Sequence, residues 1–288
     1  HYGYEKIAPV VPALPLGRKG LPNKRLYSAN KVRNFLVERG FSEVYTYSFA
    51  PKGEGDIEVE NPIGKDRPYM RHSLIPGIHR ALELNSVNAP LLELEDVKVF
   101  EVGNVFSLTG EEIRLALGYL PRDNKKAKTA TDDLKTLADE LDEFLGVNES
   151  GTWIGGQEGE HYSYEVDFNE LIKTLPEPKH NESLSVHAKN TAYKTLSHYP
   201  FIVRDVALWV SKETKAEEVE QVIRANVGEL AQKIYLFDTF EKNDKKSFAF
   251  RMVFQSFERT LVDSEANAVY ERVVVSLEHA NPVWLVRK

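Results

Sequence analysis

The stretch YPFIVRDVALWV (199–210) alternates apolar and other side chains as a half-buried β-strand does, and the segments that follow it decide the fold. After it come a segment with apolar residues at helical spacing, two strand-like segments around a short charged turn, a second helical segment and a last short strand. These six elements are expected over residues 201–210, 214–230, 233–240, 246–256, 263–280 and 282–288. The order βαββαβ is typical of the ferredoxin-like fold, in which two helices cover one face of an antiparallel sheet and leave the other face open.

Strand alternation divides the side chains of this expected sheet into a core set and an open set. The core set of the third strand is large and apolar: Phe248, Phe250, Met252 and Phe254. The open set combines small, hydroxyl, charged and aromatic residues: Ser247, Ala249, Arg251, Asp205, Ala207, Trp209, Asp238 and Phe240. Such a face suits splayed single-stranded bases, because a ring stacks on a base while a carboxylate or hydroxyl bonds to its edge. A protein–protein surface and a face partly covered by the neighbouring domain remain alternatives.

Composition bounds the class of protein. The chain has 288 residues, enough for two domains, and its 42% hydrophobic and 28% charged residues are ordinary for a soluble globular protein. It has no cysteine, which excludes disulfides and thiolate metal sites. The formal net charge of −7 argues against non-specific coating of nucleic acid, although residues 195–288 are almost neutral, with 13 basic and 14 acidic residues. No apolar run is long enough to cross a membrane, and we expect a cytoplasmic protein.

A search for self-contained catalytic machinery finds none in the sequence. The eight histidines are scattered without metal-ligand spacing. The motifs GxxxxGK[ST], GxGxxG and GxSxG do not occur. We therefore predict no catalytic and no metal-ligating residues in this chain.

The residues before the ferredoxin-like segment predict a separate α+β module. Its helices are expected over 23–40, from Pro76 onward, and over 134–146. Its strands are expected over 41–50, over 99–106 paired with 113–120, and at 162–167 before a short helix, with a loop over 121–133. The polar stretch 175–190 marks the best domain boundary. We therefore expect a tail and linker over 1–20, the module over 21–190 and the ferredoxin-like domain over 191–288.

These segments resemble a known family over nearly the whole chain. The blocks YPFIVRDVALWV, LFDTF and KKSFAFRMVFQSFERTLVDSEAN are similar to the C-terminal anticodon-binding domain of the phenylalanyl-tRNA synthetase β subunit. The blocks VRNFLVERGFSEVYTYSF, NPIGKDRPYMRHSLIPGIHRAL and VFEVGNVF resemble the class II synthetase-like module of the same subunit. The resemblance implies the C-terminal part of a longer β subunit, without that family's N-terminal tRNA-binding and editing domains.

The resemblance also implies roles for residues of the open sheet face. The positions that match the family's anticodon-binding residues are Ala207, Asp238, Phe240 and Ser247, and Phe240 replaces the family's usual tyrosine. Phosphate contacts are expected from three basic residues: Lys245, Lys246 and Arg251. Arg204 and Asp205 match a family pair and are expected to form a structural ion pair rather than a direct RNA contact. The partner nucleic acid would be tRNA(Phe), and an RNA-independent interaction or scaffold module is the alternative.

For the upstream module the resemblance argues against catalysis. Class II synthetases hold ATP with an arginine after the FEVGNVF-like strand, and this chain has Ser107 there and Thr109 two residues on. Losing one donor to a developing negative charge typically costs about 2.7–4 kcal/mol, and no second arginine follows in GTWIGGQEGEHY (151–162). The resemblance therefore implies that ATP and Mg²⁺ bind to a catalytic α subunit, that this chain binds no cofactor, and that the two subunits form an (αβ)₂ heterotetramer. The helix–strand unit around Val32–Phe49 is the expected interface.

Overall fold

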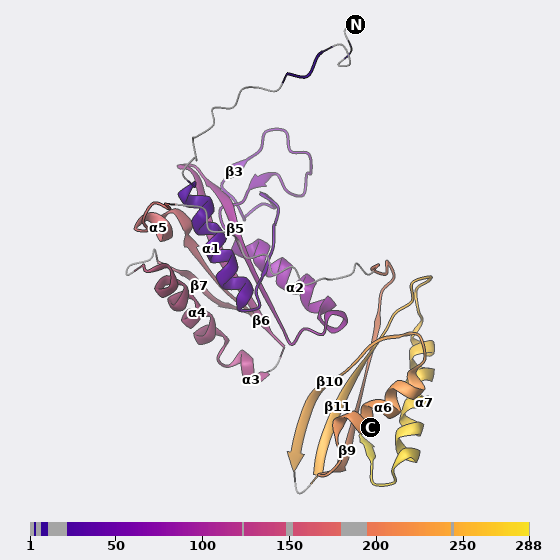
Figure 1. Cartoon of the computed structure of the whole chain (residues 1–288). Coiled ribbons are helices and arrows are strands. Elements are labelled where there is room, and N and C mark those ends of the chain that lie inside the picture. The colour runs from indigo at the N-terminus through magenta and orange to yellow at the C-terminus, as the bar shows by residue number, and fades with distance from the viewer. Residues whose placement is uncertain are drawn as a thin grey trace.

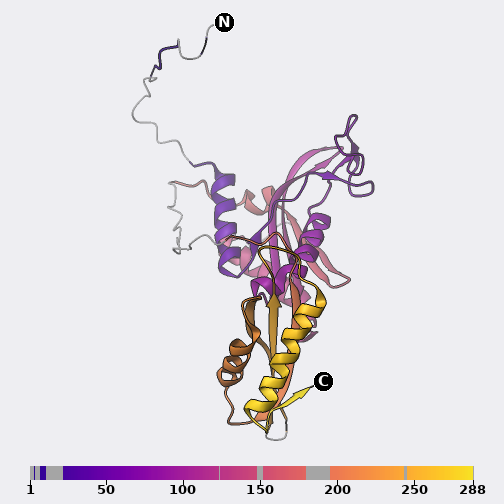
Figure 2. The same cartoon turned by 90° about the vertical axis from the view of Figure 1, so that its right-hand side faces the viewer.

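Two sheets, each covered by its own helices, organise the chain (Figures 1 and 2). The computed structural model describes residues 3, 7–10, 22–122, 124–147, 152–179, 195–242 and 245–287. The N-terminal module (22–179) contains a five-stranded sheet, and the C-terminal domain (195–287) contains a four-stranded sheet. The predicted domain boundary falls mostly on residues 180–194, which lie outside the described residues.

The sheet of the N-terminal module is built around one long antiparallel hairpin. Strand β5 (Asp96–Ser107) pairs with β6 (Gly110–Pro121) along their whole length, which confirms the predicted pairing. The strand order is β1-β5-β6-β8-β7, where β1 is Ser42–Glu43, β7 is Ile154–Glu158 and β8 is His161–Asp167. Only β1 pairs in parallel, with β5. Most of this sheet is therefore antiparallel.

Helices cover both faces of this sheet because both faces of β5 and β6 carry apolar residues. Helix α2 (Ile75–Leu92) packs Ile78 and Leu82 on one face, against Val99 and Ala116. Three helices contribute to the core on the other face: α1 (Lys24–Glu38), α4 (Ala130–Leu145) and α5 (Phe168–Lys173). Pro76 opens α2 as predicted, because a proline in the first turn loses no helical hydrogen bond.

Several element predictions for this module are wrong in detail. The expected single strand over 41–50 is split into β1 and β2 (Phe49–Ala50), which belong to different sheets. Strand β2 joins a small sheet with β4 (Tyr69–Met70) and β3 (Ile57–Glu58). The expected loop over 121–133 contains a short helix, α3 (Asn124–Ala127), and the start of α4. Helix α4 does end at Gly146, whose φ of +72° suits glycine.

The C-terminal domain confirms the βαββαβ order. Its elements are β9 (Ile202–Ser211), α6 (Ala216–Val227), β10 (Ala231–Lys242), β11 (Lys245–Phe254), α7 (Asp263–Ala280) and β12 (Leu285–Arg287). The sheet order is β10-β11-β9-β12, and every pairing is antiparallel. Both helices lie on one side of the sheet (Figure 1), where they cover the buried residues Phe248, Phe250, Met252 and Phe254.

Both helices of this domain are capped by a glutamate three residues inside the helix. Helix α6 is capped by the carboxylate of Glu218, which accepts from the Lys215 N–H at 3.3 Å, while Thr214 bonds to Ser211 instead. The N–H that precedes α7 donates to Glu265 rather than to Asp263. A carboxylate at this place accepts from the backbone N–H just before the helix, which has no partner within the helix, and so fixes where the helix begins.

Strand β10 also contacts the N-terminal module at the end of α2. The Tyr235 hydroxyl donates to the Pro90 carbonyl at 3.2 Å, and Lys233 forms an ion pair with Glu93 at 2.6 Å. Figure 1 shows the carboxyl end of α2 reaching toward the C-terminal sheet. Among the described helices, none is both long and apolar enough to cross a membrane.

Candidate nucleic-acid interface

The strand register brings the four predicted anticodon-binding residues together on the face opposite α6 and α7. One cross-strand row consists of Asp238, Ala249, Ala207 and Arg287. The next row consists of Phe240, Ser247, Trp209 and Leu285. A bulge between Leu236 and Asp238 shifts β10 by one residue and sets the register that places Asp238 and Phe240 on this face. We call these two rows the open face.

The side chains of the open face differ widely in their exposure to solvent. Phe240 is 50% exposed and Asp238 is also exposed, because β10 is an edge strand. Ser247 is only 3% exposed, although alternation places it on this side of the sheet. The Trp209 and Phe240 rings stand on either side of Ser247, with centroids 6.1 Å apart and planes at 66°. Two large rings therefore flank a shielded hydroxyl.

Sequence reasoning assigned no role to Arg287, which the structure places on the open face. Its Nη1 donates to the Ser247 hydroxyl at 3.3 Å, and its guanidinium carbon lies 5.8 Å from the centroid of the Trp209 ring. Pairing of β12 with β9 sets Arg287 opposite Ala207. Alternation over the last strand already separates Leu285 and Arg287 from the buried Trp284, and that signal predicts the face if the pairing with β9 is known.

The basic residues expected to contact phosphate have different environments. Arg251 donates to both oxygens of Asp205, at 2.8 and 2.6 Å, and lies over the Phe237 ring. The hydrogen bond to Asp205 raises the pKa of Arg251 above its usual range. Lys246 lies 3.7 Å from Glu241, whereas Lys245 has no ion-pair partner among the described residues. Lys245 is therefore the least constrained of the three.

Arg204 and Asp205 both form ion pairs, although not with each other. Arg204 pairs with Asp263 at the start of α7 and also donates to Asn267 at 2.8 Å. Asp205 pairs with Arg251, because neighbouring residues of a strand point to opposite faces. Each pair thus ties β9 to a different neighbour.

In the N-terminal module, Ser107 and Thr109 stand where class II synthetases have the ATP-holding arginine, and both lie in a turn. Ser107 and Gly110 close the β5–β6 hairpin around Leu108 and Thr109. The Ser107 and Thr109 hydroxyls lie 2.7 Å apart, and the Ser107 hydroxyl also donates to the Gly110 carbonyl at 3.3 Å. Neither side chain carries a charge, and both hydroxyls are engaged within the turn. This end of the sheet therefore does not fit an ATP-holding loop.

A buried ion pair joins Glu101, further back along β5, to Arg71. Arg71 Nη1 lies 2.9 Å from Glu101 Oε1, without the alignment of a hydrogen bond, and the two side chains are 7% and 0% exposed. The Thr46 hydroxyl donates to Glu101 Oε2 at 2.6 Å, and Arg71 Nε donates to the Asn104 carbonyl at 2.8 Å. A Cβ on Gly103 would lie 2.7 Å from Arg71 Nη2 and 2.8 Å from Glu101 Oε1. The side chains of Arg71, Glu101 and Thr46 therefore pack tightly around Gly103, without room for a side chain at that position.

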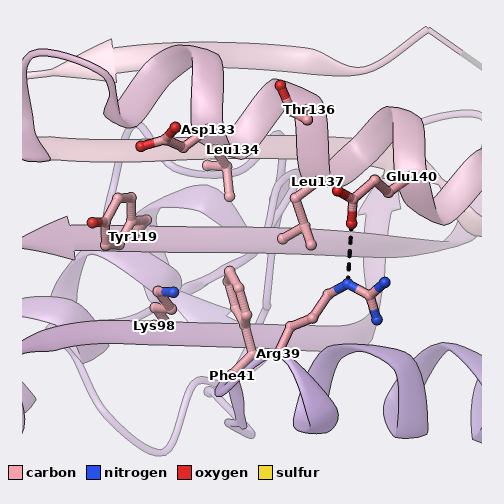
Figure 3. Close-up of a pocket in the computed structure, with 9 residues that line it drawn as sticks. All are labelled: Arg39, Phe41, Lys98, Tyr119, Asp133, Leu134, Thr136, Leu137 and Glu140. Atoms are coloured by element: carbon pink, nitrogen blue, oxygen red, sulfur yellow. Dashed lines mark hydrogen bonds and ion pairs between the residues drawn. The ribbon is translucent and has the colours of Figure 1, made fainter.

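A separate cavity of about 430 Å³ lies between α1 and α4 (Figure 3). Its floor contains Lys98, whose ammonium faces the rings of Phe41 and Tyr119 at 5.7 and 5.5 Å, and an Arg39–Glu140 ion pair of 3.1 Å stands at one side. Burial raises the pKa of Tyr119 to about 12, with Asp96 adding to the effect. None of the predicted site residues lies there. Across the described ranges, no group of three His, Cys, Asp or Glu side chains could hold a metal ion.

The family models that match this chain define its class, an aminoacyl-tRNA synthetase chain with an anticodon-binding domain. The model of the ferredoxin-fold anticodon-binding domain matches residues 197–283, and that of the phenylalanyl-tRNA synthetase β-chain CLM domain matches residues 7–192. The chain belongs to the phenylalanyl-tRNA synthetase β-chain family. The predicted fold class, α+β with a class II-like module before a ferredoxin-like domain, is confirmed.

Curated proteins similar to this chain are phenylalanine–tRNA ligase β subunits. Phenylalanine–tRNA ligase β subunits from Bacillus cereus and Halalkalibacterium halodurans are 28% and 29% identical, each over 96% of this chain. The β subunit from a Synechococcus species is 25% identical over 99% of the chain. The chain spans about 40% of the length of these relatives. A solved pyrrolysyl-tRNA synthetase from Desulfitobacterium hafniense covers 51% of this chain and 65% of its own at 14% identity, and its TM-score of 0.39 supports no functional inference.

Proposed function

We propose that this chain is part of the β subunit of a phenylalanine–tRNA ligase and that its open face binds the anticodon of tRNA(Phe). The observation that carries the proposal is the pair of adjacent cross-strand rows that hold Asp238, Phe240 and Ala207 on one face of the sheet. Two of these side chains are exposed on an edge strand, where an RNA strand can reach them without moving the backbone.

Each side chain has a distinct part in this proposal. The half-exposed Phe240 ring supplies a flat apolar surface on which a base stacks. The Asp238 carboxylate accepts hydrogen bonds from amino or imino groups of a base edge. Ala207 lies on β9 in the same row as Asp238, with Ala249 of β11 between the two. Its small side chain leaves room for the base, because a larger side chain there would stand where the base edge enters. Phe240 lacks the hydroxyl of a tyrosine, so base selection depends more heavily on Asp238.

The N-terminal module, in this proposal, pairs with the catalytic α subunit in an (αβ)₂ heterotetramer. The segment after α1 exposes three alternating aromatic residues, Tyr45, Tyr47 and Phe49, with exposed fractions of 92%, 74% and 45%. Aromatic residues that are this exposed on an extended segment suit a protein interface, where Tyr and Phe are enriched. They lie within the helix–strand unit expected to make this contact.

The α subunit would perform the chemistry. ATP and Mg²⁺ would bind to α, because the neutral Ser107 and Thr109 cannot stabilise the negative charge that grows as pyrophosphate leaves. The holoenzyme would attach phenylalanine to its tRNA in the cytoplasm, and this chain would contribute assembly and anticodon recognition. Pyrophosphate exchange by this chain alone, with phenylalanine and ATP, would contradict this division of labour.

A binding comparison tests the proposal. The affinity of the 288-residue chain is measured for tRNA(Phe) and for the same tRNA with an altered anticodon. We expect the altered anticodon to weaken binding, whereas equal affinity would favour an RNA-independent scaffold. Co-purification with a candidate α subunit, followed by an aminoacylation assay, tests the assembly part separately.

A further inference from the structure

We propose that Trp209 and Arg287 form a second nucleotide subsite beside Phe240, and that Ser247 is a positioning residue that holds Arg287 in place. The subsite takes one further nucleotide of the same single strand, with its base on the Trp209 ring and its phosphate on the Arg287 guanidinium. This inference rests on the proposed binding of RNA to the open face and adds a place for a neighbouring nucleotide.

The orientation of the Trp209 and Phe240 rings suits two stacked bases rather than one. The Trp209 and Phe240 planes meet at 66°, so a single flat base cannot stack on both rings at once. Their centroids are 6.1 Å apart, which is within the spacing that successive nucleotides of a splayed strand span easily. Trp209 lies on β9 and Phe240 on β10, with the central strand β11 between them. A strand that crosses the sheet from β10 to β9 therefore meets the two rings in turn.

Arg287 is an unpaired cation at the end of that path. Four other arginines of this domain are held by carboxylates: Arg204 by Asp263, Arg224 by Glu220, Arg251 by Asp205 and Arg259 by Glu265. Arg287 is exposed, and within 195–242 and 245–287 no carboxylate pairs with it. Nη1 donates a hydrogen bond to the Ser247 hydroxyl. A guanidinium carries five N–H donors in a planar fork, so most of them are available for a phosphate.

Ser247 acts through Arg287 because it cannot easily reach a base itself. Its side chain is 3% exposed and its hydroxyl accepts from the guanidinium that lies above it. The rest of the fold keeps Arg287 in position, since the buried Trp284 anchors β12 and Ala207 opposite leaves space. The result is a cation that lies over the sheet, bonded to Ser247, with no carboxylate partner among the described residues of this domain.

The first test separates stacking from charge. Trp209→Ala should weaken binding of tRNA(Phe) to the full 288-residue chain about 5- to 150-fold, and Trp209→Phe should retain most of the affinity. Arg287→Ala should reduce the magnitude of the slope of log K against log[salt] by about 1, which is the change expected when one phosphate contact is lost. Phe257→Ala and Arg272→Ala are matched controls, because Phe257 is 52% exposed outside the sheet and Arg272 lies on α7. Wild-type affinity in Trp209→Ala together with an unchanged slope in Arg287→Ala would overturn the inference.

The second test addresses Ser247. If Ser247 only holds Arg287, Ser247→Ala weakens binding in the wild-type chain but has no further effect in the Arg287→Ala chain. Additive effects would contradict the positioning role and would indicate a direct contact with RNA.

The proposal that the open face binds the anticodon has its own control in the same assay. If the wild-type chain ignores the anticodon and Phe240→Ala binds as wild type does, both proposals fail. If Phe240→Ala weakens binding and the Trp209 and Arg287 variants do not, only the second subsite fails.

Discussion

Replacing Arg71 by methionine should destabilise the N-terminal module strongly, because it would leave Glu101 buried without its cation. Glu101 is fully buried, and Arg71 Nη1 is 2.9 Å from its Oε1. Removing one partner of a buried ion pair typically costs about 3–5 kcal/mol, since the remaining charge keeps its desolvation penalty. The substitution also removes the hydrogen bond to the Asn104 carbonyl, so we expect a loss in the free energy of unfolding of about 3–5 kcal/mol.

Two companion variants make this prediction specific. Arg71→Met/Glu101→Met should recover most of the lost stability, because no buried charge remains. Arg33→Met breaks the exposed pair of Arg33 with Glu43, which has a similar distance of 2.8 Å, and should cost at most about 1 kcal/mol. Urea denaturation measures all three, and hydrogen exchange of β5 and β9 amides shows which domain has lost stability. A loss in Arg71→Met no greater than in Arg33→Met would refute the reasoning.

Three further predictions concern the RNA face, a histidine and the α interface. Phe240→Ala should weaken tRNA binding by about 1–3 kcal/mol without unfolding the domain, measured by filter binding and circular dichroism, and an unchanged affinity would remove Phe240 from the site. Burial and the stacked His161 ring lower the pKa of His79 below 6.5, so the folded chain binds fewer protons than the unfolded chain as the pH falls below 6.5. Stability should therefore decrease on acidification across that window, and His79→Gln should flatten this part of the curve in denaturation series at several pH values. Tyr45→Asp/Tyr47→Asp should abolish co-purification with α while leaving thermal stability within a few degrees of wild type, because both side chains are exposed.

The sequence predicted the C-terminal domain well because its strands alternate regularly. The large residues of β11 have a period of two, and a one-residue error in register would have sent Phe250 and Phe254 to the wrong face. The segment 41–50 also alternates, yet it divides between two sheets, and periodicity alone does not reveal which partner a strand has.

The prediction of the candidate site was also limited by unknown strand partners. Ala207, Asp238 and Phe240 could be assigned to one face from alternation, and the structure places them in adjacent rows. Arg287 escaped prediction because its position depends on the pairing of β12 with β9, a contact between residues far apart in the sequence. The burial of Ser247 likewise depends on a side chain from another strand. Alternation assigns a residue to a face, whereas exposure on that face depends on neighbouring strands.

Photo-cross-linking from the anticodon of tRNA(Phe) tests the central claim most directly. A photoreactive nucleotide is placed in the anticodon, the complex with the 288-residue chain is irradiated, and mass spectrometry locates the cross-linked peptides. The account predicts cross-links in β9, β10 and the end of β12, around Trp209, Phe240 and Arg287. Cross-links confined to α6, α7 or the N-terminal module would contradict it.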